Sequence, residues 1–470
     1  ISLPPNDTTK QHSLGFRADF TPSDEWSGLI QGDVTHSTLG QNYRGVIDES
    51  NENIAFSDDL KRTDSRIMAR LENRMSPDAN QMLQLSWLKQ NGSQDYIKED
   101  FESIDIDYQM NFIYQSLQLD WGLNYRYNSI SFAESLFLDS DKDFDDLTQF
   151  GVLVQAQYNV TPDKLDFIIG TKADHNDLTG WENQPSARFI YKPTQNHLTW
   201  GAVSQSVRTP TLIEFNDNFR VNGTKIKELA VISSGIQALD NYRIATYLNG
   251  NDKVKSEKYL SYELGYRFSD NDWSVDLSTY YTDAKNVAVI DMNAHDEQFG
   301  PILDLFLAGR IPEVFQALTT TRIDLDFASV ADTTTKGFDV LLSWQPLDNL
   351  NTELGYSYTK YTYDLPPRVE PAIGYDSKNR QLFAKANYTF LTDHNVFATL
   401  RAENSNAYNT DSYTTLDITW NWQISPVWAT ALSGKNLFAG SHIEYNNTRE
   451  TYTLPNYIDE CITFTVSATF

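Results

Sequence analysis

The sequence is poor in the residues that several common protein classes require. It holds a single cysteine, Cys461, so no disulfide can form within the chain and no thiolate cluster can bind zinc or iron–sulfur. No apolar run reaches the roughly 18 residues that a transmembrane helix needs. Seven histidines are present, but no nucleophile elbow, zinc-protease motif or phosphate-binding glycine loop accompanies them. We therefore predict that the protein is not an enzyme and needs no cofactor.

Basic residues are also scarce, with 37 Lys and Arg against 64 Asp and Glu and a formal net charge of −27. A surface that binds nucleic acid has to neutralise phosphates, so we exclude nucleic acid as a partner. The same balance argues against a polybasic membrane-surface protein. We interpret the acidity as a property of long solvated loops, or as a means of binding cations.

Aromatic residues, by contrast, are abundant at 13%, and they include 26 Tyr and 10 Trp, which favour membrane–water interfaces. The mean hydropathy of −0.49 resembles that of a soluble protein. A transmembrane barrel gives the same average, because its lipid-facing apolar residues alternate with polar lumen residues. The composition therefore allows a membrane protein that crosses with strands.

Alternation with a period of two runs through most of the chain. In one segment Tyr262, Leu264 and Tyr266 share a face, while Glu263 and Gly265 point the other way. Most such segments have about 10–14 residues, which suits a tilted strand crossing a hydrocarbon core, whereas soluble strands are nearer 5–6. The predicted strands, about 19 in number, are 12–21, 27–38, 62–74, 81–90, 101–114, 117–130, 147–159, 164–175, 184–192, 197–208, 256–268, 272–290, 333–345, 350–363, 378–391, 395–405, 411–424, 427–437 and 457–470.

Short turns and long connections alternate between these strands. The short turns, such as 75–80, 161–164 and 392–394, carry Asp, Asn, Pro and Ser, as tight hairpins require. The long connections are 39–61, 131–146, 209–255, 291–332, 364–377 and 438–456. Short periplasmic turns and long extracellular loops are typical of outer-membrane barrels. We predict an all-β fold in which residues 1–470 form one transmembrane antiparallel β-barrel domain.

The number of predicted strands is odd, whereas bacterial single-chain barrels have even counts and an open sheet edge cannot sit in lipid. Strand 12–21 also ends in a short turn and so runs toward the periplasm, although a complete barrel begins with an upward strand. We expect about three further strands upstream, which would complete a barrel of about 22 strands.

Several local motifs follow one another in an order that resembles TonB-dependent outer-membrane receptors. Residues 206–214 (SVRTPTLIE) are similar to the Arg-Ala-Pro-x-x-x-Glu element that ends a strand before a large loop in that family. The other matching segments are 170–177 (GTKADHND) with 184–188 (QPSAR), 256–266 (SEKYLSYELGY), 336–339 (KGFD) and 434–438 (GKNLF), and the chain ends in an alternating strand that closes on Phe470. The family-motif residues, to which the resemblance assigns structural roles, are Arg208, Pro210, Glu214, Asn436, Leu437, Phe438 and Phe470.

The resemblance implies a barrel in the bacterial outer membrane that takes up a scarce nutrient, and the nutrient that we expect is a ferric siderophore. Its implied partners are the TonB–ExbB–ExbD energy-transducing complex, outer-membrane lipid and lipopolysaccharide. The family carries an N-terminal plug and a TonB-contacting box before the barrel, and nothing in this chain matches either. Two other functions stay open from the residues alone: a passive porin or channel, and a structural or adhesive protein whose acidic loops bind cations.

The long connection 209–255 holds the best ligand candidates. Its aromatic and basic side chains suit an anionic, aromatic metal chelate through stacking and charge-assisted hydrogen bonds, although the loop could equally pack on itself. The predicted ligand-binding residues there are Phe215, Phe219, Arg220, Tyr242 and Arg243. We add His175, which lies near a loop base and could reach ligand or simply satisfy a local hydrogen bond.

The segment 138–146 (LDSDKDFDD) is the densest acidic run of the chain. Its aspartates at alternate positions resemble the start of a calcium loop, but Phe144 replaces the turn glycine and Phe150 stands where the final Glu should be, which excludes an EF-hand. A looser calcium site and a solvated loop both remain, and the candidate ligands are Asp139, Asp141, Asp143 and Asp145. Alternation in the last strand places Cys461 on the lumen face as a small packed residue.

Overall fold

The fold is taken from a computed structural model of the chain, which describes residues 4, 6, 8–46, 53–94, 98–133, 145–216, 218–225, 243–291, 293–318, 323–367, 369–371, 378–404, 410–444 and 457–469. The long strands are β1 (Thr9–Ser23), β2 (Trp26–Val46), β3 (Asn53–Ser76), β4 (Ala79–Ser93), β5 (Lys98–Tyr114), β6 (Leu117–Ala133), β7 (Asp145–Thr161), β8 (Leu165–Asn176), β9 (Gly180–Thr194), β10 (His197–Arg208), β13 (Glu257–Ser269), β14 (Trp273–Asp291), β15 (Ile323–Leu347), β16 (Leu350–Asp364), β18 (Lys378–Leu391), β19 (His394–Glu403), β20 (Tyr413–Gln423), β21 (Trp428–Leu437) and β22 (Cys461–Ala468).

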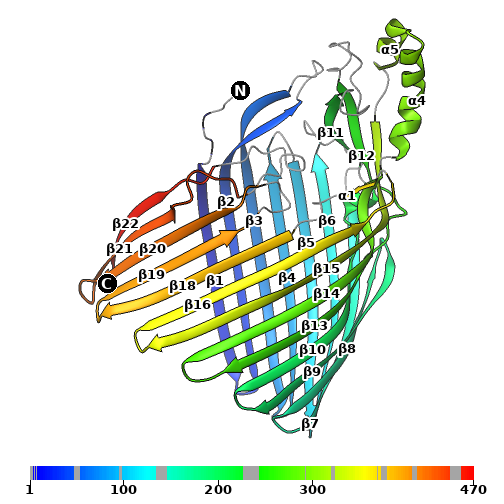
Figure 1. The fold of residues 1–470 in the computed structure, drawn as a ribbon. Coiled ribbons are helices and arrows are strands. Elements are labelled where there is room, and N and C mark those ends of the chain that lie inside the picture. The colour runs from blue at the N-terminus through cyan, green and yellow to red at the C-terminus, as the bar shows by residue number, and fades with distance from the viewer. Residues whose placement is uncertain are drawn as a thin grey trace.

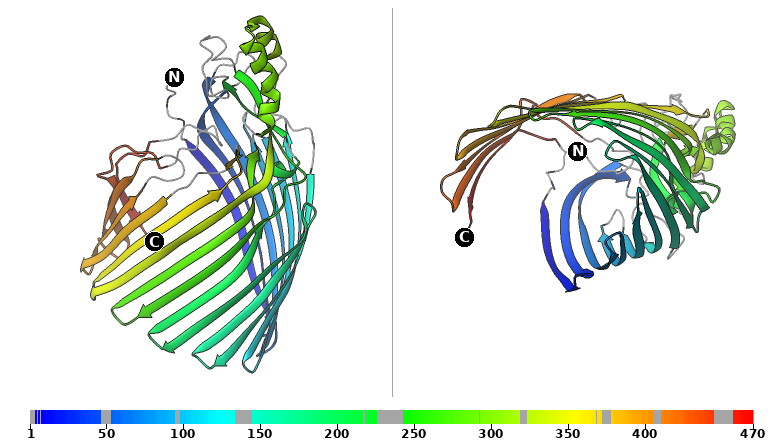
Figure 2. Two further views of the ribbon diagram at one scale, coloured as in Figure 1. Left: turned by 45° about the vertical axis from the view of Figure 1, so that its right-hand side comes forward. Right: turned by 90° about the horizontal axis from the view of Figure 1, so that it is seen from below.

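Each of these strands pairs antiparallel with the next one in this series, so they form one continuous meander. The prediction of an all-β antiparallel sheet with about 19 long strands is confirmed. Figure 2 shows the sheet curving as the wall of a barrel does, with β1 and β22 at its two edges. Among the described residues no pairing joins these two edge strands.

The period-two pattern separates an apolar face from a polar one. Tyr262 and Leu264 of β13 are 49% and 52% exposed on one face, and Tyr262 pairs across the sheet with the equally apolar-facing Tyr281. The opposite face carries charged pairs such as Arg66–Asp33. Exposed apolar side chains in a strand of this length belong against lipid, so the apolar face is the outward one and the polar face lines the lumen.

Lumen-facing charges are largely compensated across neighbouring strands. The ion pair Arg126–Asp105 measures 2.7 Å and Arg401–Asp417 measures 2.8 Å. Cys461 pairs in register with Lys435, which places it on this lumen face as predicted, but its side chain is exposed and not packed, so that part of the prediction is wrong. Because opposite charges on facing strands attract, these pairs stabilise the register of the wall.

The predicted short turns all lie at one end of the sheet, along the lower and lower-left edge in Figure 1, and the long connections lie at the other end. Several strands are longer than predicted: β2 has 21 residues, β3 has 24 and β15 has 25. Crossing the hydrocarbon core takes about 9–11 residues. The additional residues of these strands therefore extend the wall beyond the membrane on the long-loop side. The prediction that 39–61 and 291–332 are loops is wrong in part, because strands occupy the ends of both segments.

The helices and the remaining strands all fall in the long connections. They are α1 (Leu212–Phe215), β11 (Asn218–Lys225), β12 (Arg243–Asn249), α4 (Asn293–Leu307), α5 (Ile311–Leu318) and β17 (Val369–Pro371). In the described part of the chain, no helix has the length and apolar character needed to cross a membrane.

Gly337, in the segment 336–339, shows why one motif position in the wall excludes a side chain. A Cβ there would overlap the carbonyl oxygen of Tyr358 and the ring of Tyr280. The Tyr280 hydroxyl is held by Thr359 Oγ1 at 2.6 Å, so the ring cannot move aside freely. We predict that Gly337→Val lowers the free energy of unfolding by about 1–3 kcal/mol through overpacking. Urea unfolding of the refolded barrel would measure this.

The double variant Gly337→Val/Tyr280→Ala provides the control, because it removes the ring that the new side chain meets. It should lose less stability than the sum of the two single variants. Additive losses would show that Tyr280 does not restrict this position.

Candidate functional site

The candidate ligand platform is an extension of the sheet at the long-loop end, where two connections predicted as separate loops join. β11 pairs antiparallel with β12, and β12 pairs in parallel with the start of β15, from Thr246 opposite Ile323 to Asn249 opposite Asp326. β15 pairs with the upper part of β14, which in turn pairs with β17. These strands rise above the wall together with α4 and α5 (Figure 1). The connections 209–255 and 291–332 therefore form one structural unit.

Three small hydrophobic cores stabilise this extension. One joins α4 and α5 to β15 through the buried Val314, Leu318 and Ile323. The second packs Leu248 of β12 against Phe327 of β15. The third contains Val289, Ala331 and Val369 from β14, β15 and β17. Burial of this kind is what makes an exposed loop a rigid platform, because the apolar groups leave water and the backbone is fixed around them.

An ion network anchors the base of the extension to the wall. Arg208, at the end of β10, forms two hydrogen bonds to Glu214, with Nη1 and Nη2 lying 3.0 and 2.9 Å from the two carboxylate oxygens. Nη2 also lies 2.5 Å from Glu257 Oε1. Glu257 accepts further hydrogen bonds from the Ala288 amide and the Tyr259 hydroxyl. One guanidinium therefore joins β10, α1 and β13.

The network lies toward the long-loop end from Tyr262, which is the aromatic residue nearest that end on the outward face of β13, because Glu257 is the first residue of the strand. Burial alone would raise the pKa of Glu257, which is 5% exposed, but hydrogen bonds from Arg208 and Ala288 outweigh burial and lower it. The same contacts, led by the hydrogen bond to Glu257, raise the pKa of Arg208. Both residues are thus held in their charged forms, which suits the structural role predicted for Arg208 and Glu214.

The short helix α1 explains why the motif 206–214 needs its residue types. Pro210 is buried before the helix, and Thr211 caps it by accepting a hydrogen bond from the Glu214 amide at 3.2 Å. The Glu214 carboxylate in turn accepts a hydrogen bond from the Thr211 amide at 2.8 Å, which completes a capping box. The motif therefore turns the chain sharply from the wall into the platform.

Asn251 ties the returning chain to this turn and to β15. Its amide N–H donates to the Glu214 carbonyl at 2.9 Å, and its side chain donates to the Phe327 carbonyl at 2.8 Å. Ser329 receives a further hydrogen bond from the Lys255 amide at 2.9 Å. Sequence reasoning missed these residues, because a polar side chain that bonds to distant backbone leaves no periodic signal.

The predicted ligand residues fall mostly on the platform. Phe215 ends α1 and is half-buried, while Phe219 and Arg220 lie on β11 opposite Leu248 and Tyr247. Arg243 begins β12, and Tyr242 lies outside the described residues. The hairpin of β11 and β12 thus holds Phe219 and Arg220 side by side at one end, whereas Arg243 lies opposite Lys225 at the other end. Their contact with a ligand stays a prediction.

His175 lies on the outward, apolar face of the wall and not on the lumen face. It pairs in register with Phe150 and with Trp181, both of which are exposed on the apolar face. Its ring lies 5.3 Å from that of Trp181 in an edge arrangement. This placement favours packing in the aromatic belt of the membrane over contact with a ligand in the lumen.

Most of the predicted acidic loop 138–146 lies outside the described residues. Asp139, Asp141 and Asp143 lie outside the described residues, and Asp145 begins β7. Within the ranges that the structure covers, no group of three His, Cys, Asp or Glu side chains could hold a metal ion. A calcium site at 138–146 stays an untested expectation.

The segment 434–438 ends β21 in a tight turn. Asn436 and Phe438 have positive φ angles of 55° and 69°. The Asn436 amide donates to Asp417 Oδ1 at 2.9 Å and its side chain donates to the Asp459 carbonyl at 3.3 Å. Asn436 and Leu437 are the last two residues of β21, and the bonds of Asn436 join this end to β20 and to the segment that precedes β22. Phe438 is 84% exposed, and Phe470 lies outside the described residues.

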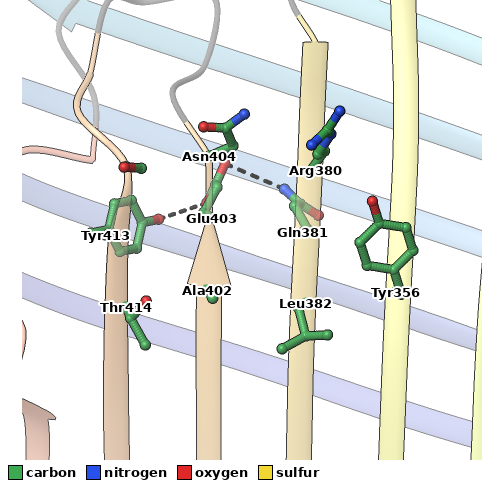
Figure 3. A pocket seen from close by; sticks show the side chains of 10 residues that line it. Tyr356, Arg380, Gln381, Leu382, Ala402, Glu403, Asn404, Tyr413 and Thr414 are labelled. Atoms are coloured by element: carbon green, nitrogen blue, oxygen red, sulfur yellow. Dashed lines mark hydrogen bonds between the residues drawn. The ribbon is translucent and has the colours of Figure 1, made fainter.

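A cavity of about 340 Å³ opens at the upper ends of β16, β18, β19 and β20. Gln381, Glu403 and Tyr413 form one lumen-facing row, and Figure 3 shows Glu403 accepting hydrogen bonds from both neighbours, at 3.4 Å from Gln381 and 2.7 Å from Tyr413. Other residues around the cavity, among them Tyr356 and Arg380, belong to the outward face by register, so the cavity spans the upper rim of the wall and does not lie within the lumen alone. The row offers hydrogen-bonding groups to a ligand that enters the lumen from above.

Sequence reasoning did not identify this row. Each member lies near the loop end of a predicted strand, on the lumen side of the alternation, but only the register of three strands brings them together. That register is nonlocal and leaves no spacing motif.

Comparisons with known proteins agree with this architecture. The siderophore receptor PirA from Pseudomonas aeruginosa is similar in structure, with a TM-score of 0.63, 12% identity and coverage of 99% of this chain and 78% of that one. The FrpB iron transporter from Neisseria meningitidis has a TM-score of 0.68 and 13% identity over 98% of this chain and 72% of its own. The copper transporter OprC has a TM-score of 0.65 and 10% identity over 99% and 72%.

At these identities the solved structures show the fold alone. A comparison with curated proteins found no match to the chain. The family comparison goes further, because residues 3–437 match a family described as TonB dependent receptor-like, beta-barrel. The family and the structural neighbours are receptors and transporters rather than enzymes. Since the match covers nearly the whole chain, the protein belongs to the TonB-dependent receptor family of outer-membrane barrels.

Proposed function

We propose that the protein is a multi-pass outer-membrane receptor that takes up a ferric siderophore with energy supplied by the TonB–ExbB–ExbD complex. The family match over residues 3–437 carries this proposal. Two structural neighbours are a siderophore receptor and an iron transporter, which favours iron chelates as the ligand class. Lipid and lipopolysaccharide would surround the apolar outward face.

The platform supports capture of an anionic chelate from outside the cell. Aromatic and basic residues of the hairpin, among them Phe219, Arg220 and Arg243, lie on strands that the cores and the Arg208 network hold in place. Aromatic rings can stack on a planar chelating group, and guanidinium groups can form charge-assisted hydrogen bonds with its carboxylate or catecholate oxygens. The polar lumen below provides a path rather than chemistry.

Uptake in iron-starved cells tests the proposal. Cells that lack the receptor are complemented with the full protein, and accumulation of radioactive iron is followed with catecholate and hydroxamate siderophores, with haem and with copper as competitors. We expect saturable uptake of one siderophore class that disappears when TonB is absent. Uptake that persists without TonB would instead identify a passive channel, and competition by copper alone would identify a different cargo.

The variant Arg220→Ala/Arg243→Ala tests whether the ligand binds at the β11–β12 hairpin. We expect a rise of roughly tenfold or more in the Kd of the chelate, because each charge-assisted hydrogen bond contributes about 1.5–3 kcal/mol. Arg310→Ala is the matched control, since Arg310 lies on the same platform but forms an exposed ion pair with Glu313. An unchanged Kd in the double variant would contradict the proposed ligand position.

A further inference from the structure

Two of the seven histidines face each other across the first hairpin. His12 of β1 is the direct register partner of His36 of β2. The next pair below them on the same face is Leu14 and Val34, which are 75% and 43% exposed on the apolar side of the wall, and the next pair above is polar. Because side chains two residues apart on a strand share a face, both histidines point outward, at the upper edge of the apolar band.

The ring of His36 is held in a defined orientation. Its Nδ1 lies 3.0 Å from the hydroxyl of Thr63, which is the register partner of His36 on β3. The two nitrogens of an imidazole point to opposite sides of the ring, so Nε2 of His36 faces away from β3. A bond to the second ring nitrogen is how proteins fix the tautomer and orientation of a metal-binding histidine. His12 is exposed and has no hydrogen bond or ion pair with any residue that the structure describes, so its ring can turn toward His36.

We propose that His12 and His36 chelate one divalent transition-metal ion, with Cu²⁺ bound most tightly. Directly opposite positions of an antiparallel pair place two Cβ atoms roughly 4.5–5.5 Å apart, which allows two imidazole nitrogens to reach one ion at about 2.0–2.1 Å. Imidazole is a good ligand for Cu²⁺, Ni²⁺ and Zn²⁺, and the general order of affinities puts Cu²⁺ first. Water would occupy the remaining coordination positions. The site lies outside the lumen and does not depend on the proposed uptake function.

The surroundings of the pair leave room for a hydrated ion and also limit its affinity. A cavity of about 390 Å³ extends from His36 past Thr63 and Asn91, which lie in the same row of the sheet. Lys61 and Lys98 also line this cavity, and their charges repel a cation. In the described part of the chain no group of three His, Cys, Asp or Glu side chains surrounds an ion position, so the two histidines have no third ligand of this kind. We therefore expect weaker binding than in a centre with three or four protein ligands.

A bound ion would link the two strands of the first hairpin where they leave the membrane. The backbone pairing of β1 with β2 runs past this point, from Thr9 opposite Leu39 downward. A ligand that binds only the folded state stabilises it by an amount that grows with the ratio of metal concentration to Kd. Metal should therefore slow hydrogen exchange in the upper part of β1 and leave the strands on the far side of the wall unchanged.

Titration of the full protein with Cu²⁺ in mild detergent tests this site. We expect the Kd of the ion to rise by about tenfold or more in His12→Gln and in His36→Gln, because even loss of a partner behind a metal ligand costs about 10–100-fold. Thr63→Val removes such a partner and should raise the Kd by about tenfold. Electron paramagnetic resonance of the bound Cu²⁺ should show two nitrogen ligands in the wild type and one in each single histidine variant.

The matched control is His175→Gln/His197→Gln, which removes two histidines that lie on β8 and β10 and are not register partners. It should bind Cu²⁺ as the wild type does, and circular dichroism would confirm that each variant is folded. Equal Cu²⁺ affinity in the wild type and in His12→Gln/His36→Gln would overturn the proposal, because the ion would then be held elsewhere. Equal loss in both double variants, or a single nitrogen ligand in the wild-type spectrum, would also overturn it.

Discussion

Replacing Arg208 with methionine is expected to lower the free energy of unfolding by about 2–4 kcal/mol. Removing one partner of a buried ion pair costs roughly 3–5 kcal/mol, because the remaining charge is left without compensation, and the lower range applies here since Arg208 is 39% exposed. The two carboxylates left behind, on Glu214 and Glu257, are 12% and 5% exposed and would then repel each other. Urea unfolding followed by tryptophan fluorescence measures the loss.

The pH dependence of that loss distinguishes the ion network from simple packing. The folded-state pKa of Glu257 in wild type lies below its unfolded value, so its contribution is fully present above about pH 4.3 and disappears as the pH falls through the folded-state pKa. The difference between wild type and Arg208→Met should therefore shrink in acid. A difference that stays constant with pH would mean that Arg208 acts through its aliphatic part.

Arg66→Met is the matched control for this experiment. Arg66 also forms an ion pair across two strands, with Asp33 at 3.0 Å, but its side chain is 65% exposed. Exposed pairs contribute about 0–1 kcal/mol, so this variant should be nearly as stable as wild type. The contrast tests whether burial, and not the mere presence of an ion pair, makes the Arg208 network important.

The barrel wall was predictable from the sequence because its signal is local. A strand that faces lipid on one side and the lumen on the other must alternate apolar and polar residues. Segments such as the one around Tyr262 can therefore be recognised without knowing which strands pair with them. Turn residues then fix the hairpins at the short-turn end. Only the ends of the strands were predicted wrongly. Above the membrane the strands do not contact lipid, so apolar and polar residues need not alternate there.

The platform was less predictable, because nonlocal contacts define it. The residues 323–327 (IDLDF) do alternate, and α5 has apolar residues at helical spacing, so these two elements left a readable signal. The parallel pairing of β12 with β15 left none, since it joins residues 77 positions apart. The same holds for the row of Gln381, Glu403 and Tyr413, whose members meet only through register.

Replacing Val289 with aspartate is expected to unfold the platform while the barrel below it remains folded. Val289 is fully buried between Ala331 and Val369, and an unpaired carboxylate in such a place costs several kcal/mol. The three small cores that stabilise the platform cannot absorb that cost, so local opening should precede global unfolding. Hydrogen exchange would become fast in residues 287–291 and 326–331 and stay slow in the wall strands.

The same variant links the platform to ligand capture, because a ligand that needs the β11–β12 hairpin in place should bind at least tenfold more weakly when the platform is unfolded. Leu307→Asp is the control: it introduces the same charge on α4 at a position that is 73% exposed, where the effect on stability should stay within about 0.5 kcal/mol. If Val289→Asp opens the platform and siderophore affinity does not change, the ligand is bound by the lumen wall instead. The row of Gln381, Glu403 and Tyr413 would then be the first place to examine, since it belongs to the barrel and would survive loss of the platform.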